Sequence, residues 1–260
     1  MKFTVVIPAR YGSTRLAGKA LADIHGKPMV QHVYERALKS TATNVYVATD
    51  DQRIMDALGA YDSQVLMTSP KHMSGTDRLA EVTEQLNMED EDILVNVQGD
   101  EPLIPPAVID QVAANLERNT DCVCATLSES INSKDVFFDP SAVKVVTDAK
   151  GRALYFSRAP IPWPRDQIET LKNAAVDLLD AQMPDGMNIQ RHIGIYAYRS
   201  KLLQDFTKWQ PAPLEALESL EQLRILWQGE KIHVAEACST VPSGVDTQAD
   251  LDKVREVLGT

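Results

Sequence analysis

Apolar and polar positions along the first hundred residues follow two alternating periods. Short apolar runs of strand length occur at 3–7, 44–48, 64–67 and 93–97. Between them, apolar residues recur at helical spacing over 29–39, 52–58 and 77–86. Strands alternating with helices predict an α/β fold with a doubly wound, mostly parallel, Rossmann-like sheet and helices on both faces.

The second half of the chain has a less regular pattern. It predicts strands at 122–127, 143–147, 153–157, 192–199 and 232–237, and helices at 108–116, 214–227 and 248–258. The turn-rich stretch 148–152 predicts a hairpin, which is either an antiparallel extension of the sheet or a dimer arm. Residues 160–185 are first proline-rich and then acidic, and we expect a surface excursion with one weak helix at 168–179.

A cluster of cations follows the first strand. Arg10, Arg15 and Lys19 are separated by small residues, and such a loop can bring backbone N–H groups and positive side chains to phosphates. The P-loop spacing does not fit, because five residues separate Gly12 from Gly18. The stretch is therefore either a phosphate loop of another kind or a solvated basic turn.

The overall charge makes that cluster more informative. The chain of 260 residues has 37 acidic and 26 basic residues, a net charge of −11, which argues against a nucleic-acid or anionic-membrane partner. No apolar run approaches the roughly 20 residues of a spanning helix, and the N-terminus lacks the pattern of a signal peptide. We therefore expect a soluble cytoplasmic protein with no membrane partner.

The cysteines do not predict a disulfide framework. There are three, an odd number, and Cys122 and Cys124 lie two positions apart in a predicted strand. The pair is either two buried thiols or two metal ligands, and burial is the commoner role of such cysteines.

Two aspartates are candidates for a magnesium site. Asp100 follows the strand 93–97 in Gln-Gly-Asp-Glu-Pro, and it is either a helix cap or a metal ligand. A phosphate-binding loop favours the second role, because Mg²⁺ is usually held by one or two carboxylates together with substrate phosphates. Asp246, in Gly-Val-Asp-Thr, is either the second ligand or the N-cap of the last helix.

Three further segments carry candidate binding residues. The run 74–78 (Ser-Gly-Thr-Asp-Arg) either reads the edge of a base or begins a capped helix. Arg158 follows an aromatic strand and is of the type that clamps a carboxylate with two hydrogen bonds. His192 and Tyr196 share one face of a predicted strand, and a lone strand histidine is more often a satisfied core residue than a ligand.

Nine segments in order resemble one family, the 3-deoxy-manno-octulosonate (Kdo) cytidylyltransferases, over nearly the whole chain. They are IPARYGSTRLAGK, NVYVATDD, HMSGTDRLAE, ILVNVQGDEPLIPP, AVKVVTD, ALYFSRAPIPW, HIGIYAYR, LEQLRILWQGEKIHV and SGVDTQADL. The chain departs from the family's pattern at Ala17, where proline is usual, and in the acidic stretch 167–190, which is longer than expected.

The resemblance implies a reaction and a role for each matching residue. Kdo would attack the α-phosphorus of CTP, giving CMP-Kdo and pyrophosphate for lipopolysaccharide synthesis, in a homodimer that uses Mg²⁺. The nucleotide would be bound by Arg10, Ser13, Arg15, Lys19, Ser74, Gly75 and Arg78. Mg²⁺ would be held by Asp100 and Asp246, which with Lys19 form the catalytic set. The sugar acid would contact Gln98, Arg158, His192, Tyr196, Glu221 and Gln222.

One domain over residues 1–260 is then expected, with a nucleotide-binding half at 1–120 and a sugar-acid-binding and dimerisation half at 121–260. Two other interpretations stay open. One is a related nucleotidyltransferase that uses another sugar acid or an amino-substituted Kdo. The other is a nucleotide-binding regulatory module without catalysis, which would tolerate loss of the two carboxylates.

Overall fold

The computed structural model describes residues 1–12, 16–72, 74–166 and 189–259. The chain forms two compact units. The first unit comprises Met1–Ala125, Ile195–Trp209 and Cys238–Thr260, and the second comprises Thr126–Gly194 and Gln210–Ala237. A single division at residue 120 does not describe these units, because the chain returns to the first unit twice.

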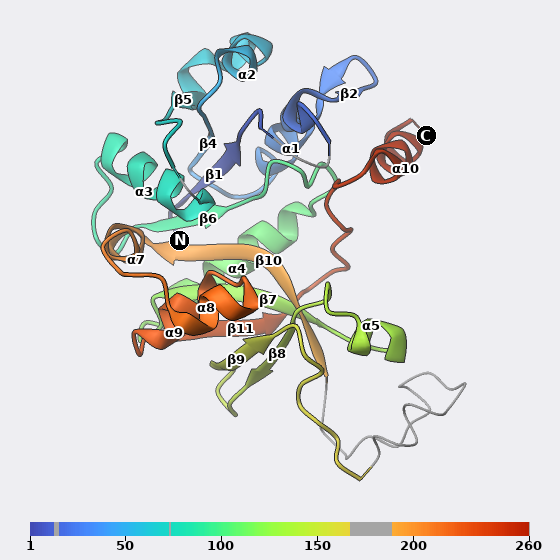
Figure 1. Ribbon diagram of the computed structural model, residues 1–260. Coiled ribbons are helices and arrows are strands. Elements are labelled where there is room, and N and C mark those ends of the chain that lie inside the picture. Colours follow the sequence, from blue (N-terminus) through green and yellow to red (C-terminus); the bar gives the residue numbers. More distant parts are fainter. Residues whose placement is uncertain (13–15, 73, 167–188, 260) are drawn as a thin grey trace. The chain divides into compact units, whose positions relative to one another are not determined.

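The first unit is built on parallel strands (Figure 1). Its central strand β1 (Phe3–Ala9) pairs in parallel with β4 (Asn44–Thr49) and β6 (Ile93–Asn96), and β4 pairs in parallel with β5 (Val65–Met67). The end of β10 (Gln190–Arg199) is antiparallel to β6. The short apolar runs are typical of strands with both faces covered, and the predicted mostly parallel sheet is confirmed.

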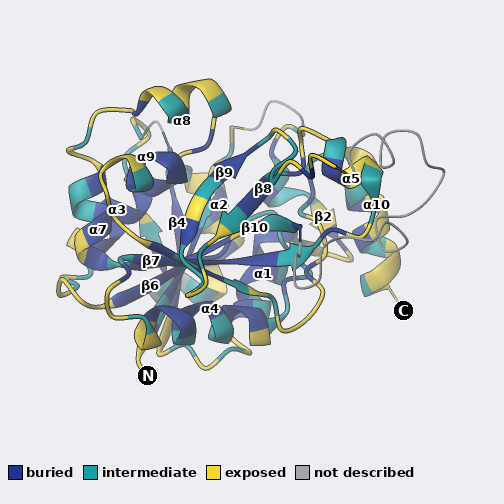
Figure 2. Ribbon diagram, turned by 90° about the horizontal axis from the view of Figure 1, so that it is seen from below, coloured by how far each residue is buried: buried dark blue, intermediate teal, exposed yellow. Residues whose placement is uncertain are grey.

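Helices cover both faces of these strands. The helices of the first unit are α1 (Met29–Ala37), α2 (Gln52–Ala57), α3 (Gly75–Gln85), α4 (Pro106–Arg118), α7 (Ser200–Phe206) and α10 (Gln248–Leu258). The crossovers β1–α1–β4 and β5–α3–β6 run in opposite directions across the sheet, so right-handed connections place α1 and α3 on opposite faces. The strands between them are buried (Figure 2). No helix in the described ranges has the length and apolarity needed to cross a membrane.

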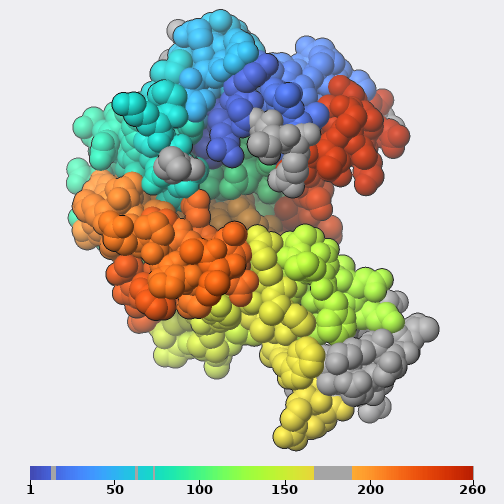
Figure 3. All heavy atoms as spheres, viewed as in Figure 1, coloured from blue at the N-terminus to red at the C-terminus, as the bar shows by residue number. Residues whose placement is uncertain are grey.

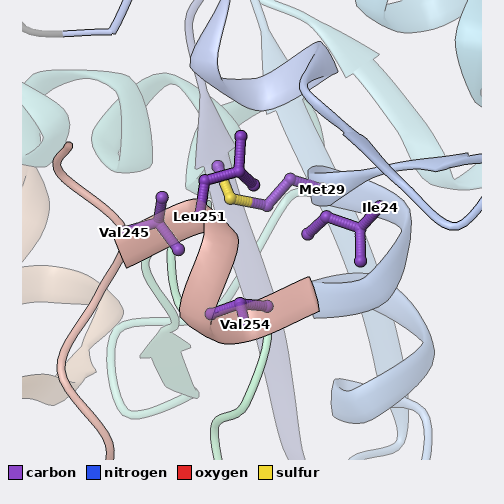
Figure 4. Packing of buried hydrophobic residues seen from close by; sticks show 5 residues of the cluster. All are labelled: Ile24, Met29, Val245, Leu251 and Val254. Carbon is purple, nitrogen blue, oxygen red and sulfur yellow. The ribbon is translucent and has the colours of Figure 1, made fainter. Parts of the chain in front are cut away.

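A small hairpin and the C-terminal helix form an apolar cluster that the sequence pattern did not reveal. Strands β2 (Asp23–Ile24) and β3 (Lys27–Pro28) are two residues long, too short for a periodic signal. His25 and Gly26 connect them with φ of 51° and 82°, as in a tight hairpin turn. The buried residues of the cluster are Ile24, Met29, Val245, Leu251 and Val254 (Figure 4). The C-terminal helix therefore lies beside the N-terminal part of the chain (Figure 3).

The second unit contains the predicted antiparallel hairpin. Its strands are β8 (Lys144–Thr147), β9 (Ala153–Ser157) and β11 (Ile232–Glu236), together with the start of β10 and β7 (Cys124–Ser130) from Thr126 onward. Its helices are α5 (Lys134–Phe138), α8 (Pro213–Glu218) and α9 (Gln222–Trp227). Strands β8 and β9 pair in antiparallel orientation, with an irregularity between Val146 and Thr147. The predicted helix at 168–179 lies outside the described residues.

The helix predicted over 214–227 is wrong in one respect, because the structure divides it into α8 and α9. Ser219 adopts a left-handed conformation with φ of 51°, which ends α8 at Glu218. The apolar spacing continues through this break, so periodicity alone could not reveal it. The end of α8 leaves the Glu218 carbonyl to accept a hydrogen bond from the Arg158 Nε at 2.7 Å.

The two neighbouring cysteines are buried thiols, as the commoner alternative predicted. Cys122 and Cys124 are 1% and 0% exposed, and neither forms a disulfide. Within the described ranges, no group of three His, Cys, Asp or Glu side chains is arranged to hold a metal ion.

We expect Leu251→Ala to lower the free energy of unfolding by about 2–5 kcal/mol, because Leu251 is buried in the apolar cluster. Val257→Ala, on an exposed position of the same helix, should change it by about 0.5 kcal/mol or less. Chemical denaturation followed by circular dichroism measures both. Equal effects of the two substitutions would show that the cluster does not anchor α10.

Candidate active site

The three residues predicted to be catalytic meet in the first unit. The Lys19 Nζ lies 2.5 Å from the Asp100 Oδ2 and 3.1 Å from the Asp246 Oδ1, although these residues are far apart in sequence. They line a pocket of about 650 Å³ at the ends of β1 and β6. Arg10 and Gln98 line the same pocket. Parallel sheets bind ligands at this carboxyl edge, so the predicted location is consistent with the fold.

Two glycines make the pocket possible. A Cβ atom on Gly99 would lie 2.8 Å from the Pro8 carbonyl oxygen, so only glycine lets the segment after β6 pack against the end of β1. Gly18 has φ of 64°, and a Cβ there would lie 3.2 Å from the ring of Tyr11. Gly18 precedes the short 3₁₀ turn that begins at Lys19 and so determines where the lysine emerges.

Tyr11 is a residue of this loop that sequence reasoning did not single out. Its ring lies against Gly18 on one side and under the guanidinium of Arg53, whose central carbon is 3.3 Å from the ring centroid. Arg53 is held in turn by two hydrogen bonds to Asp51, the N-cap of α2. The cation–π contact therefore ties the loop to α2. No sequence signal indicates it, because residues 11 and 53 meet only in the folded chain.

The segment that carries Asp246 is fixed by contacts of its neighbouring residues. The N-cap of α10 is Thr247, which forms a capping box with Asp250, so the alternative role of Asp246 as the cap is wrong. The backbone N–H of Val245 donates to the Asp100 carbonyl at 2.8 Å. Asp100 is not a helix cap either, since α4 is preceded by Pro105. Both aspartates are thus available for a role in the pocket.

A third carboxyl group lies beside this pair. Burial raises the pKa of Glu101 to about 8, and the neighbouring charge of Asp100 adds to the effect. The Oε2 atom of Glu101 is buried and has no hydrogen-bond partner within the described ranges. Glu101 is therefore a buried carboxyl next to Asp100, and Lys19 offsets the charge of the two aspartates.

The segment predicted to surround a base begins a capped helix, as the alternative held. Ser74 is the N-cap of α3, in a capping box with Asp77. Arg78 is 4% exposed, donates to Asp50 at 2.6 Å, and also bonds to the Thr68 hydroxyl. Contacts of Ser74, Gly75 and Arg78 with cytosine stay a prediction. Ser13 and Arg15 lie outside the described residues.

The residues predicted to bind the sugar acid are divided between the units. Gln98 and Tyr196 belong to the first unit. The second unit contains Arg158, His192, Glu221 and Gln222. Tyr196 is buried and stacks on Tyr198, with the ring centroids 5.5 Å apart. Gln222 is 8% exposed, and its Nε2 has no hydrogen-bond partner in the described part of the chain.

His192 is a neutral residue of the second unit. The Thr126 hydroxyl donates to the Ile193 carbonyl, so its oxygen accepts from the His192 Nε2–H at 3.0 Å. Desolvation lowers the pKa of His192 to about 3, and the positive charge of Arg191 contributes. The ring also meets Phe156 edge-on. The interpretation as a hydrogen-bonded histidine is confirmed, although the residue is partly exposed, and a sugar contact stays a prediction.

The comparisons with known proteins show the family of the chain. The cytidylyltransferase family model matches residues 4–232. The chain is 58% identical to 3-deoxy-manno-octulosonate cytidylyltransferase of Saccharophagus degradans, covering 99% of both chains. It is 60% identical to the protein of the same name from Cellvibrio japonicus, covering 99% of this chain and 98% of the other. The chain belongs to the 3-deoxy-manno-octulosonate cytidylyltransferase family.

Two solved structures have a similar fold. A CMP-2-keto-3-deoxy-manno-octonic acid synthetase complexed with CTP matches with a TM-score of 0.86 and 43% identity, covering 100% of this chain and 99% of that chain. A cytidylyltransferase from Leptospira borgpetersenii matches with a TM-score of 0.59, 99% of this chain and 86% of that one, and at 17% identity it shows the fold alone.

The pair Asp100 and Asp246 fits the requirements of a magnesium ion bound together with phosphates. One ammonium group reaches an oxygen of each carboxylate, so both lie within reach of a single cation. Mg²⁺ takes oxygen ligands and is commonly held by one or two carboxylates while substrate phosphates and water complete the shell. The side chains of this cytidylyltransferase pocket therefore suit that ion.

Stability should depend on pH through His192. The folded residue has a pKa of about 3 against 6.5 for an ordinary histidine, so the unfolded chain binds an extra proton between these values. The contribution of neutral His192 to the free energy of unfolding is therefore fully present above pH 6.5 and is lost as the pH falls toward 3. The His192→Asn variant has no such pH-dependent contribution. The difference in free energy of unfolding between wild type and variant should therefore narrow from about pH 7 to pH 5. Urea unfolding at each pH measures it, and a constant difference would contradict a neutral, desolvated ring.

Proposed function

We propose that this protein is a cytidylyltransferase that activates Kdo with CTP. The hydroxyl on the anomeric carbon of Kdo attacks the α-phosphorus of CTP. A bond forms between that oxygen and phosphorus, and the bond from phosphorus to the β-phosphate oxygen breaks. The hydroxyl proton is released, and the products are CMP-Kdo and pyrophosphate.

The observation that carries this proposal is the meeting of Lys19, Asp100 and Asp246 in one pocket. Displacement at phosphorus needs in-line positioning and neutralisation of oxygen charge, and little covalent work from the protein. Lys19 supplies positive charge for the phosphate oxygens, and the two carboxylates would hold the metal ion that supplies more. The relatives named for this reaction, at 58–60% identity over nearly the full chain, support the same assignment.

The roles of the residues follow from their charges. Lys19 and Arg10 bind the triphosphate, and Lys19 also stabilises the negative charge that develops on the phosphate oxygens. Asp100 and Asp246 are the residues that would hold Mg²⁺. When bound there, the ion would neutralise phosphate charge and lower the pKa of the attacking hydroxyl. Gly99 and Gly18 let the backbone place these groups at the pocket.

The residues proposed to bind the sugar acid are polar groups that suit a hydroxylated acid. The buried Nε2 of Gln222 is a donor with no acceptor among the described residues, which favours a ligand oxygen as its partner. Arg158 supplies positive charge for a carboxylate. Gln98, His192, Tyr196 and Glu221 are proposed to contact the sugar on the strength of the family resemblance.

The wider setting is proposed on the resemblance alone. The protein would act in the cytoplasm as a homodimer, with the hairpin β8–β9 as a dimer arm, and would provide CMP-Kdo for lipopolysaccharide synthesis.

Pyrophosphate release assayed with four nucleotides and several sugar acids, with and without Mg²⁺, tests the function. Release that requires CTP, Kdo and Mg²⁺ together supports it. Nucleotide binding without turnover would indicate a regulatory module instead, and turnover only with an amino-substituted Kdo would change the acceptor.

We expect Asp100→Asn to lower the rate of pyrophosphate release by about 100-fold or more, because the amide loses the charge needed for the metal. The fold should persist, since the backbone carbonyl that binds Val245 is unchanged. Asp252→Asn, an exposed carboxylate on α10, is the matched control and should retain wild-type turnover. Near-normal turnover of the Asp100 variant would remove this residue from the mechanism.

Lys19→Ala should weaken the use of CTP, lowering kcat/KM for CTP by about 10- to 1,000-fold through loss of a charge on the triphosphate. Lys27→Ala removes a surface lysine that pairs with Glu35 and should leave kcat/KM unchanged. Steady-state kinetics at saturating Kdo separates the two variants. An unchanged KM and kcat in the Lys19 variant would exclude the loop from catalysis.

A further inference from the structure

Lys144 is a buried lysine in the second unit for which the reaction gives no direct role. It is 0% exposed, and its ammonium donates to the carbonyl oxygens of Asp139, Ala142 and Arg158 at 2.8, 2.5 and 2.8 Å. An ammonium has three donors, so all are used within the protein. Burial lowers its pKa, while the charge of Asp139 opposes the shift. A buried charge that binds three carbonyls holds three backbone segments together.

Glu218, the last residue of α8, also binds the segment that contains Arg158. Its carboxylate accepts from the Ser157 hydroxyl at 2.6 Å, the Arg158 backbone N–H at 3.0 Å and the Tyr155 hydroxyl at 3.4 Å. Burial alone would raise the pKa of Glu218, but these hydrogen bonds lower it below the usual value. Its carbonyl accepts from the Arg158 Nε at 2.7 Å. Ser219 ends the helix at this point, which makes a terminal carbonyl available to the arginine.

The guanidinium of Arg158 is held by neutral acceptors. Besides the Glu218 carbonyl, it bonds to the Pro140 carbonyl through Nη1 at 3.0 Å. No carboxylate among the described residues forms an ion pair with it, and its Nη2 has no acceptor there. Carbonyls fix the arginine without neutralising it, and the Glu218 carboxylate attracts its charge without forming an ion pair with it. The charge and one edge of the fork are therefore available for a bound anion.

We propose that Lys144 and Glu218 are positioning residues that hold Arg158 for the carboxylate of the acceptor sugar, and that they thereby set the preference for an acidic sugar. Lys144 fixes the Arg158 carbonyl and the neighbouring loop, and Glu218 fixes the Arg158 N–H and guanidinium. Neither group touches the substrate. This inference rests on the proposed function, because it assigns the acceptor side of that reaction.

The test compares Kdo with its C1 carboxamide, which has the same shape without the charge. In Lys144→Met, kcat/KM for Kdo should fall by about 10- to 100-fold, the loss typical of a charged hydrogen bond, while the KM for CTP stays within about twofold. The carboxamide should lose about twofold or less, so the preference for the acid falls. Glu218→Gln should give the same pattern and replaces Lys144→Met if that variant does not fold.

A double-mutant cycle decides whether the lysine acts through the arginine. In Arg158→Ala, the added Lys144→Met should lower kcat/KM for Kdo by no more than about twofold. Glu215→Gln, in the Arg224 ion pair of the same helices, is the control for general destabilisation and should leave the acid preference unchanged. Equal losses for both acceptors, or full additivity with Arg158→Ala, would overturn the inference. A wild type that makes no CMP-Kdo would instead overturn the proposed function, and this inference with it.

Discussion

The ion contact of Lys19 with Asp100 and Asp246 is the interaction on which the first unit's site depends. Two carboxylates at one pocket edge repel each other, and a third carboxyl, Glu101, lies beside them with a raised pKa. The ammonium offsets that charge while leaving both aspartates partly exposed. A lysine and a divalent ion are both cations that such a pair accepts, so the same geometry suits a triphosphate bound with magnesium.

Apolar packing brings those charges together. Val245 lies one residue before Asp246 and belongs to the cluster formed with Ile24, Met29 and α10 (Figure 4). Leu16 and Leu103, near Lys19 and Asp100 in sequence, pack against the same cluster. The hydrophobic effect is non-directional, and here it holds three segments in place while glycines and one backbone hydrogen bond set their close approach. The position of Lys19, Asp100 and Asp246 therefore depends on the apolar packing of the segments that carry them.

The two units hold their cations by different chemistry. In the first unit, carboxylates pair with Lys19, so its charge is offset in the absence of a ligand. In the second, Lys144 and Arg158 bond to backbone carbonyls, which orient a cation without cancelling its charge. The first arrangement suits a site where phosphates arrive with a metal ion. The second suits recognition of a single carboxylate, where the unpaired charge of the arginine supplies the attraction.

The sequence by itself determined the class of fold and the charged residues at the pocket. Apolar spacing is local, so it located the parallel strands and their helices, and the ordered family segments indicated Lys19, Asp100 and Asp246. Only the tertiary structure decided that Thr247, and not Asp246, caps α10 and that Ser74 caps α3. It also showed that Ser219 interrupts the helix predicted over 214–227. The Tyr11–Arg53 contact and the bonds of Lys144 were likewise not predictable. The Tyr11–Arg53 contact and the bond from Lys144 to the Arg158 carbonyl join atoms distant in sequence, and a pattern of apolar and polar positions carries no information about such pairs.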